Sequence, residues 1–386
     1  MRSKELSIYI HIPFCLKKCA YCDFLSFPAG EKLQEKYFKR LCREIEDAAE
    51  RYSDRAVISI FFGGGTPSVL PADKIEYLMK LINDRYSLAS DVEISLECNP
   101  GTVDIDKFKA YINAGINRLS IGCQSLDDKE LALLGRIHKE VDFYRAFECA
   151  RSAGFSNINV DLMSALPGQT KKSYLNSLKK LIDLKPEHIS AYSLIIEEGT
   201  EFYNRYHKDL NIRDKGGLPE YLPSEEEERG MLYYGRDLLN AAGYEQYEIS
   251  NYAFPGYECR HNMVYWKRGD YAGFGLGASS CVDEVRWKNI EKIEEYIMRD
   301  NLEIRTNLQK LSPEEQRSEA MFLGLRLRRG VDKLPFAERY GDEPSFLYGR
   351  WINRMISEGL LSESSGRLFL TDRGQDLANY VMVGFV

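Results

Sequence analysis

The first half of this sequence alternates between short apolar segments typical of β-strands and longer amphipathic segments typical of helices. The strand-like segments are residues 7–14, 56–62, 92–96, 118–123, 157–163 and 188–196. The helical segments that follow them are residues 31–52, 71–86, 104–113, 127–134, 141–153 and 171–184. Strands that read as nearly continuous apolar runs are typical of parallel sheets covered on both faces. Six such units predict an α/β fold, built as a partial (β/α)₆ barrel rather than an open sheet.

The pattern changes after residue 198. Residues 199–223 look looser, and the sequence Ser224-Glu-Glu-Glu is typical of a capping box that begins a helix. From residue 311 onward, helical segments are followed by a short strand at residues 367–371 and a last helix. We therefore expect three regions. The barrel core would comprise residues 1–235, a connecting region residues 236–300, and a smaller α+β, winged-helix-like domain residues 301–386.

Charge and composition exclude several classes of function. The 386 residues carry a net charge of −7, and residues 308–386 contain eleven basic and eleven acidic side chains. A neutral domain is a poor match for a phosphate backbone, so we expect no nucleic-acid partner. No apolar run approaches the roughly 20 residues that span a membrane. The N-terminus has no signal-peptide pattern, and nine dispersed cysteines argue against a disulfide framework. These features predict a cytoplasmic protein.

Three cysteines form a C-x₃-C-x₂-C triplet directly after the first predicted strand: Cys15, Cys19 and Cys22. Thiolates this close together can share one metal centre, and soft sulfur favours zinc or iron–sulfur. A structural zinc ion is usually held by four ligands, and no second cysteine pair completes such a site. The spacing favours a [4Fe–4S] cluster with one iron left open. A zinc knuckle or a chance grouping of cysteines is the alternative.

Further polar residues fall at the C-terminal ends of the predicted strands. They are Gly63–Pro67, Glu97, Gln124 with Ser125, Asp161, and Tyr192 with Ser193. In a parallel βα barrel, functional groups gather at this end, so we expect these side chains to converge on one mouth. The glycine run allows backbone to approach a ligand closely but lacks the lysine of a P-loop. Glu97 is suited to bind ribose hydroxyls, whereas Asp161 taken alone could be an ordinary strand-end residue.

The cysteine triplet, with an aromatic residue before its third cysteine, resembles the radical S-adenosylmethionine (SAM) superfamily. Over nearly its full length the chain is similar to the HemW haem-chaperone group, relatives of oxygen-independent coproporphyrinogen III oxidase. The resemblance implies a (β/α)₆ radical SAM barrel, a [4Fe–4S] cluster and SAM. It implies that Cys15, Cys19 and Cys22 hold the cluster, that Gly64, Gly65 and Thr66 meet the amino-acid part of SAM, and that Glu97 binds its ribose. Further SAM contacts would come from Tyr9, Tyr21, Gln124, Arg136 and Asp161.

Two departures favour the chaperone group over the oxidases. The oxidases carry a fourth cysteine two residues after the third, where this chain has Phe24, and they extend further before the first strand. The run from His261 to Trp266 matches the H-N-x-x-Y-W signature that the chaperone group associates with haem. Imidazole is a common axial ligand of haem iron, so we expect His261 to bind haem.

Two alternatives to His261 as a haem ligand remain open, and one departure from relatives bears on the haem site. Cys259 offers a competing thiolate two residues before His261. An isolated histidine of this kind could instead cap a turn before a strand, with Tyr265 and Trp266 in the core. Relatives also commonly have a histidine where this chain has Ser279, so any haem site in that segment would be altered.

The sequence thus predicts a protein that binds haem, a [4Fe–4S] cluster and SAM and passes haem to an acceptor protein. The resemblance also implies an electron donor to the cluster. The alternative is an enzyme that decarboxylates coproporphyrinogen III by radical chemistry, which Phe24 argues against. A nucleic-acid module built on the C-terminal domain is a third class, and its charge balance disfavours it.

Overall fold

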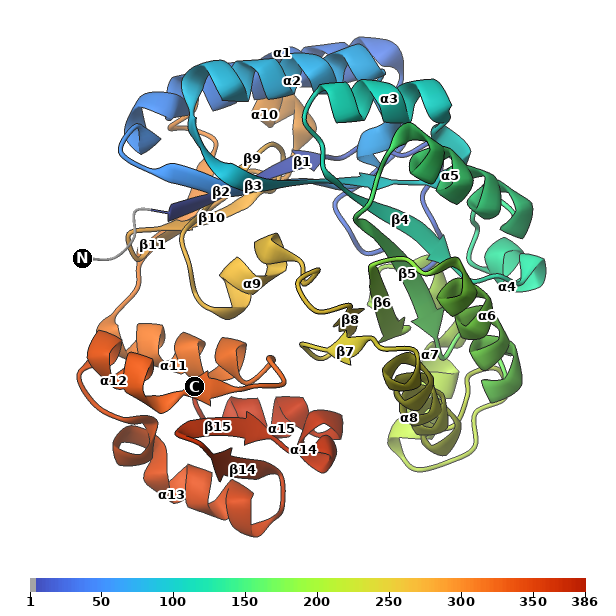
Figure 1. Cartoon of the computed structure of the whole chain (residues 1–386), viewed down its shortest axis with the longest axis vertical. Coiled ribbons are helices and arrows are strands. Elements are labelled where there is room, and N and C mark those ends of the chain that lie inside the picture. Colours follow the sequence, from blue (N-terminus) through green and yellow to red (C-terminus); the bar gives the residue numbers. More distant parts are fainter. Residues whose placement is uncertain (1–4) are drawn as a thin grey trace.

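The computed structural model describes residues 5–386. Residues 1–4, which belong to the N-terminus for which no signal peptide is predicted, lie outside that range. Six parallel strands lie side by side in chain order at the centre of a 12-stranded sheet (Figure 1). They are β1 (Glu5–Ile12), β2 (Ala56–Gly64), β3 (Ser87–Cys98), β4 (Arg118–Gln124), β5 (Ile158–Ser164) and β6 (His188–Ser193). All six predicted strands are confirmed. β3 begins five residues earlier than predicted because its first residues are largely exposed and polar, and hydrophobic periodicity does not detect them.

Helices cover the outer face of the curved sheet (Figure 1). They are α1 (Glu31–Ala48), α2 (Ala72–Arg85), α3 (Ile105–Asn113), α4 (Asp128–Leu133), α5 (Glu140–Ala153) and α6 (Lys171–Leu184). In α1 the apolar residues Tyr37, Leu41 and Ile45 recur at helical spacing and are fully buried against the sheet. Within residues 5–386, none of the helices is both long enough and apolar enough to cross a bilayer.

The sheet continues on both sides with strands from residues 245–310. On the β6 side lie β7 (Glu245–Gln246) and β8 (Asn251–Ala253), both antiparallel. On the other side β9 (Tyr271–Phe274) pairs with β1 in parallel, and β10 (Ser279–Val282), β11 (Val285–Asn289) and β12 (Arg305–Lys310) follow antiparallel. The segment between the barrel and the C-terminal domain therefore contributes to the main sheet.

The prediction of a loose stretch over residues 199–223 was wrong for residues 201–214, whereas residues 215–223 form no helix or strand. The chain forms α7 (Glu201–Asp214), which begins where the Thr200 hydroxyl accepts a hydrogen bond from the Tyr203 amide. Its apolar face is narrow and rests mainly on Phe202 and Tyr206, so the surrounding charged residues obscured the helical pattern. The next helix, α8 (Glu225–Ala241), has the predicted capping box between Ser224 and Glu227.

The C-terminal residues form a smaller α+β domain with its own hydrophobic core. Its sheet has β13 (Val331–Asp332), β15 (Arg367–Leu370) and β14 (Leu361–Ser364), in that order. Its helices are α11 (Pro313–Gly324), α12 (Lys333–Tyr340), α13 (Pro344–Ser357), α14 (Asp372–Asp376) and α15 (Ala378–Val383). Together with the parallel barrel, this domain confirms the predicted fold class.

A short helix, α9 (Arg260–Trp266), carries the H-N-x-x-Y-W motif and lies on the concave side of the sheet (Figure 1). It contacts β2 on one side and α11 of the C-terminal domain on the other. His261 therefore lies within a helix and does not cap a turn before a strand, although its side chain is buried as that alternative expected. The last helix of the main body, α10 (Ile293–Met298), packs against α1.

Candidate functional site

A cavity of about 430 Å³ lies inside the barrel, and every candidate cluster, SAM and haem residue proposed from the sequence except Cys259 contributes to its wall. These residues are Tyr9, Cys15, Cys19, Tyr21, Cys22, Gly64, Gly65, Thr66, Glu97, Gln124, Arg136, Asp161 and His261. Tyr192 also lines the cavity. Four strand-end residues expected at the mouth are not part of this wall: Gly63, Pro67, Ser125 and Ser193. The Ser125 hydroxyl donates to Glu130, and Ser193 pairs with Ser164.

The cysteine loop runs from the end of β1 toward α1 and is held by backbone hydrogen bonds. The Cys15 amide donates to the Phe27 carbonyl at 3.2 Å, and the Phe27 amide donates to the Pro13 carbonyl at 2.9 Å. The Ala20 amide donates to the Leu134 carbonyl at 3.0 Å, which ties the loop to the end of α4. All three cysteines are free thiols and partly exposed. The fold thus presents them on a fixed loop at the cavity wall.

The glycine-rich turn after β2 fixes the other side of this loop. The Gly65 amide donates to the Ile12 carbonyl, and the Thr66 amide donates to the Phe14 carbonyl, each at 2.8 Å. A Cβ on Gly65 would lie 2.9 Å from Cys15 Sγ, and Gly64 has a φ of +119° that favours glycine. Larger residues at either position would push the turn away from the cysteines.

The surroundings of the three thiols suit a cluster. Among residues 5–386, no three Cys, His, Asp or Glu side chains are grouped closely enough to hold one metal ion. Hydrogen-bond donors face the sulfur atoms instead. Thr66 Oγ1 lies 3.7 Å from Cys15 Sγ, and Arg136 Nη1 lies 3.7 Å from Cys19 Sγ. Such donors stabilise the negative charge of thiolates bound to iron. The residues present therefore fit a [4Fe–4S] cluster.

Two partly buried carboxyl groups face the cavity beside the glycine turn. Glu97 Oε2 accepts a hydrogen bond from the Gly64 amide at 3.1 Å. Burial, followed by the nearby Asp161 charge, raises the pKa of Glu97 to about 8. Asp161 accepts hydrogen bonds from Asn159 Nδ2 at 2.8 Å and from Ser120 Oγ at 3.4 Å, and burial also raises its pKa. A carboxyl group that is protonated near neutral pH can both donate to and accept from ribose hydroxyls.

A second polar group surrounds Arg136, next to Asp161. Its Nη2 donates to the Gly122 carbonyl at 2.7 Å, whereas its buried Nε has no hydrogen-bond partner. Gln124 has a φ of +68°, a strained conformation for a residue with a side chain, and its amide oxygen accepts from the Tyr192 hydroxyl at 3.0 Å. Strain and an unpaired donor at one place are typical of a wall shaped to hold a polar ligand.

His261 lies in the same cavity as the cysteines, although the two are far apart in the sequence. Its ring is buried, packs against Phe61 with a centroid distance of 5.2 Å, and uses both nitrogens. Nδ1 lies 2.9 Å from Ser59 Oγ, and Nε2 lies 2.9 Å from the Tyr265 hydroxyl. Burial, followed by the positive charge of Arg118, lowers the pKa of His261 to about 3. The imidazole is therefore neutral and keeps a lone pair at physiological pH.

Cys259, the competing haem ligand, and Ser279, which stands where relatives have a histidine, lie elsewhere. Cys259 is fully buried, does not line the cavity, and its thiol donates to Glu93 at 3.7 Å. Ser279 is exposed at the start of β10 and lies outside the cavity wall. In the conformation described, neither residue can reach a ligand bound in the cavity.

Sequence reasoning missed several polar residues that line the base of the cavity. They are Arg118, Ser120, Asn159, His188 and Ser190. Each occupies an alternate position of a strand whose other residues are apolar, so each points into the barrel. Two-residue periodicity within β4, β5 and β6 is the signal that identifies them, and it is hidden because the apolar residues between them make each strand look like a continuous apolar run.

Comparison with known proteins agrees with this geometry. The sequence model of the Radical SAM superfamily matches residues 9–181, and that of the HemN C-terminal domain matches residues 311–377. The heme chaperone HemW of Bacillus subtilis (strain 168) is 38% identical over 98% of this chain and 99% of the relative. The heme chaperone HemW of Lactococcus lactis is 36% identical over 100% of this chain and 98% of the relative.

Among solved structures, coproporphyrinogen III oxidase (HemN) from Escherichia coli has the same fold. It superposes with a TM-score of 0.84 over 99% of this chain and 90% of that chain, at 23% sequence identity. At that identity the likeness supports the fold alone, whereas the full-length HemW relatives define the family. The chain belongs to the HemW haem-chaperone family of the radical SAM superfamily.

Proposed function

We propose that this protein is a cytoplasmic haem chaperone that binds haem, a [4Fe–4S] cluster and SAM and delivers haem to an acceptor protein. The observation that carries the proposal is the single cavity lined by the cysteine triplet, the SAM-type residues and the histidine of the H-N-x-x-Y-W motif. The names of full-length relatives point to the same role. The neutral C-terminal domain argues against a nucleic-acid partner.

In this proposal Cys15, Cys19 and Cys22 hold the cluster, and metal binding would keep their sulfur atoms deprotonated. When bound, the cluster and SAM together supply one-electron chemistry. Glu97 would bind the ribose of SAM, and the turn from Gly64 to Thr66 would meet its amino-acid end. Tyr9, Tyr21, Gln124, Arg136 and Asp161 would complete the SAM pocket, since all line the cavity and Arg136 keeps an unpaired donor.

For haem, the arrangement favours Nε2 of His261 as the iron-facing atom. Its neighbour Tyr265 lines the cavity, whereas Ser59, which meets Nδ1, belongs to the wall behind. A hydrogen bond on the far nitrogen orients an imidazole ligand and fixes its tautomer. Iron binding at Nε2 would replace the hydrogen bond to the Tyr265 hydroxyl. Cys259 is a weaker candidate, because it is buried outside the cavity.

The exposed rim of the cavity at the cysteine loop, where Lys17, Lys18 and Phe24 line the opening, is the proposed approach for an electron donor. Leu16 and Phe24 are 57% and 70% exposed there, and Lys17 and Lys18 lie between them in the sequence and are also exposed. An apolar pair next to basic side chains suits a small acidic redox protein that docks transiently. Phe24 is also the position where oxidases carry a fourth cysteine, which supports the chaperone role over coproporphyrinogen III decarboxylation.

Anaerobic reconstitution with iron and sulfide, followed by haem titration and a coproporphyrinogen III assay, tests the proposal. We expect a cluster, haem binding with a Soret band, and no protoporphyrinogen IX. His261→Ala should weaken haem binding and shift the Soret band while iron and sulfide contents stay unchanged. Steady formation of protoporphyrinogen IX would favour the oxidase alternative. Full cluster content in Cys15→Ala, Cys19→Ala and Cys22→Ala would contradict the ligand assignment.

A further inference from the structure

Arg118, the first residue of β4, is a buried cation that is largely unpaired. Its side chain is 2% exposed and lines the base of the cavity. The structure gives it one hydrogen bond, from Nη1 to Ser95 Oγ at 3.5 Å, and its buried Nε has no partner. A guanidinium group carries five N–H donors, so most of its hydrogen-bonding capacity is unused. Burying a charge without a partner costs several kcal/mol, so such a group is normally paired or faces a ligand.

The acidic residues nearest to Arg118 are committed to other donors. Glu93 accepts hydrogen bonds from the backbone amides of Arg260 and His261, at 3.0 and 3.1 Å. Asp161 is held by Asn159 and Ser120, as described above. Among residues 5–386, no carboxylate forms an ion pair with Arg118. The charge of Arg118 is therefore available to a ligand in the cavity.

Arg118 lies below the proposed SAM contacts and beside the haem motif. Along β4 it is four residues before Gly122, about 13 Å from the level where Gly122 meets Arg136. Across the sheet its register partner is Ser95, whose own partner is Phe61. The His261 ring packs on Phe61, so Arg118 and His261 share the base of the cavity.

We propose that Arg118 anchors a carboxylate at the base of the cavity, and that this carboxylate is a propionate of the haem whose iron faces His261. This inference rests on the proposed function, because it assumes that haem enters the cavity. The planar fork of an arginine matches a carboxylate with two parallel N–H···O bonds. The carboxylate of an amino-acid ligand, such as the methionine end of SAM, has the same chemistry and is the second source to be tested.

The experiment compares ferric haem with its dimethyl ester, in which both propionates are uncharged. Each is titrated into anaerobically reconstituted wild type, Arg118→Gln and Arg118→Lys, and SAM affinity is measured in parallel. Wild type should bind free haem roughly ten- to a hundredfold more tightly than the ester, as expected for charged hydrogen bonds. Arg118→Gln should lose that preference while binding the ester as wild type does. Arg118→Lys keeps the positive charge but loses the planar guanidinium fork, so it should retain part of the preference for free haem over the ester.

Arg40→Gln is the matched control. Arg40 is also buried, at 4% exposure, and its Nη1 and Nη2 have no partners, but it does not line the cavity. Its variant should keep the wild-type preference for free haem. If Arg118→Gln does not fold, the wild-type and Arg118→Lys titrations decide the question.

Each other outcome overturns the assignment in a different way. If wild type binds haem and its ester tightly and with equal affinity, Arg118 does not anchor a propionate. That result would leave the chaperone proposal unaffected. An Arg118→Gln variant that loses SAM affinity but still discriminates between haem and ester would assign the carboxylate to SAM. Absence of haem binding by wild type would contradict the proposed function and this inference together.

Discussion

Glu97 is held at the cavity wall in a form that favours its proton. Burial and the neighbouring Asp161 charge disfavour the carboxylate, while the Gly64 amide only partly compensates. The balance raises its pKa from an ordinary value of 4.5 to about 8. The folded protein therefore binds this proton more tightly than the unfolded chain does. The raised pKa that suits this carboxyl group to ribose therefore lowers the stability of the folded protein at higher pH.

Between pH 4.5 and pH 8, the unfolded chain loses the Glu97 proton before the folded protein does. This group therefore lowers the free energy of unfolding as pH rises through that window, and it adds no further slope above pH 8. In Glu97→Gln, the free energy of unfolding should fall by about 2–4 kcal/mol less than in wild type across the same pH window. Asp161, whose pKa is also raised, remains in the variant and keeps its own contribution. Urea unfolding of ligand-free protein at several pH values measures the slope.

The exposed Glu294→Gln variant controls for the loss of a surface carboxylate and should leave the slope unchanged. An unchanged slope in Glu97→Gln would contradict the raised pKa.

Single residues were predictable where their chemistry is rare at a strand end, as for the cysteine triplet, Glu97 and Gln124. Arg118 was not, because its role depends on which donors already occupy Glu93 and Asp161. Such a role can be recognised only when the hydrogen-bond partners of every neighbouring residue in the folded protein are known. The spacing of residues along one strand does not contain that information.

Among the elements, the long buried strands and amphipathic helices were predictable because each carries enough apolar residues to establish a period. Strands β7 to β12 were missed because each is six residues or shorter and begins or ends near polar residues. α9 was missed for a similar reason, since only His261 among its seven residues is buried. Its helical form depends on partners from β2, β3 and α11, which a local sequence pattern cannot supply.

Glu93 of β3 holds the first turn of α9, and this contact tests how the helix supports His261. Its two carboxylate oxygens accept the amides of Arg260 and His261, which no intrahelical bond would satisfy. Glu93→Gln removes the negative charge and should lower the free energy of unfolding by about 1 kcal/mol. Because the same contact positions His261, haem affinity should fall as well. Urea unfolding and haem titration give the two readouts.

Asp104→Asn is the matched control at the element scale. Asp104 accepts the Lys107 amide at 2.8 Å at the start of α3, which lies on the outer face of the sheet. The Asp104→Asn change should lower the free energy of unfolding by an amount similar to Glu93→Gln and leave haem affinity unchanged. Equal loss of haem affinity in both variants would show that stability alone, rather than α9, controls binding.

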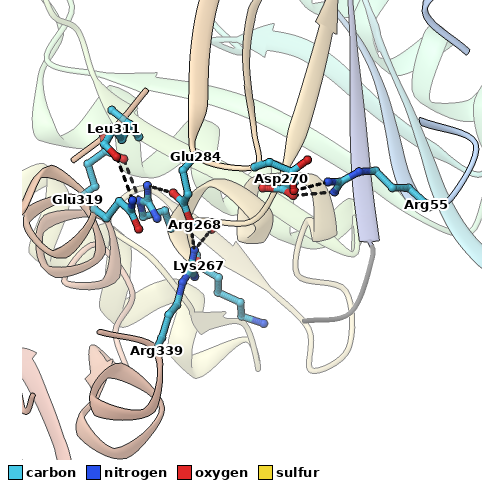
Figure 2. A network of polar contacts seen from close by, with 10 residues as sticks. Arg55, Lys267, Arg268, Asp270, Glu284, Leu311, Glu319 and Arg339 are labelled. Atoms are coloured by element: carbon cyan, nitrogen blue, oxygen red, sulfur yellow. Dashed lines mark hydrogen bonds and ion pairs between the residues drawn. The ribbon is translucent and has the colours of Figure 1, made fainter. Parts of the chain in front are cut away.

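At the scale of the whole molecule, a buried ion cluster joins the end of α9 to the C-terminal domain (Figure 2). Arg268, two residues after the end of α9, donates through Nε to Glu319 of α11 at 3.0 Å and also pairs with Glu284 at the β10–β11 turn. Arg339 of α12 donates to the Arg268 carbonyl at 3.0 Å. The barrel thus fixes the first turn of α9, and the C-terminal domain fixes its end.

Breaking this cluster should therefore affect both stability and haem. Glu319→Gln leaves Arg268, whose side chain is 5% exposed, with a weaker partner in a buried site. Removing one member of a buried pair typically costs about 3–5 kcal/mol, and the remaining Glu284 contact places the expected loss near 2–3 kcal/mol. Haem affinity should fall because α9 loses its C-terminal anchor. Iron and sulfide contents should stay constant, because the cysteine loop is held by β1, β2 and α4.

Asp372→Asn separates this effect from a general loosening of the two parts of the chain. Asp372 of the C-terminal domain pairs with Arg236 of α8 at 3.2 Å, but it is 55% exposed, so its loss should cost less than ~1 kcal/mol. Haem affinity should stay at the wild-type value in that variant. If Glu319→Gln loses stability but binds haem as wild type does, α9 keeps its position without the C-terminal domain. The domain would then stabilise the fold without shaping the haem site.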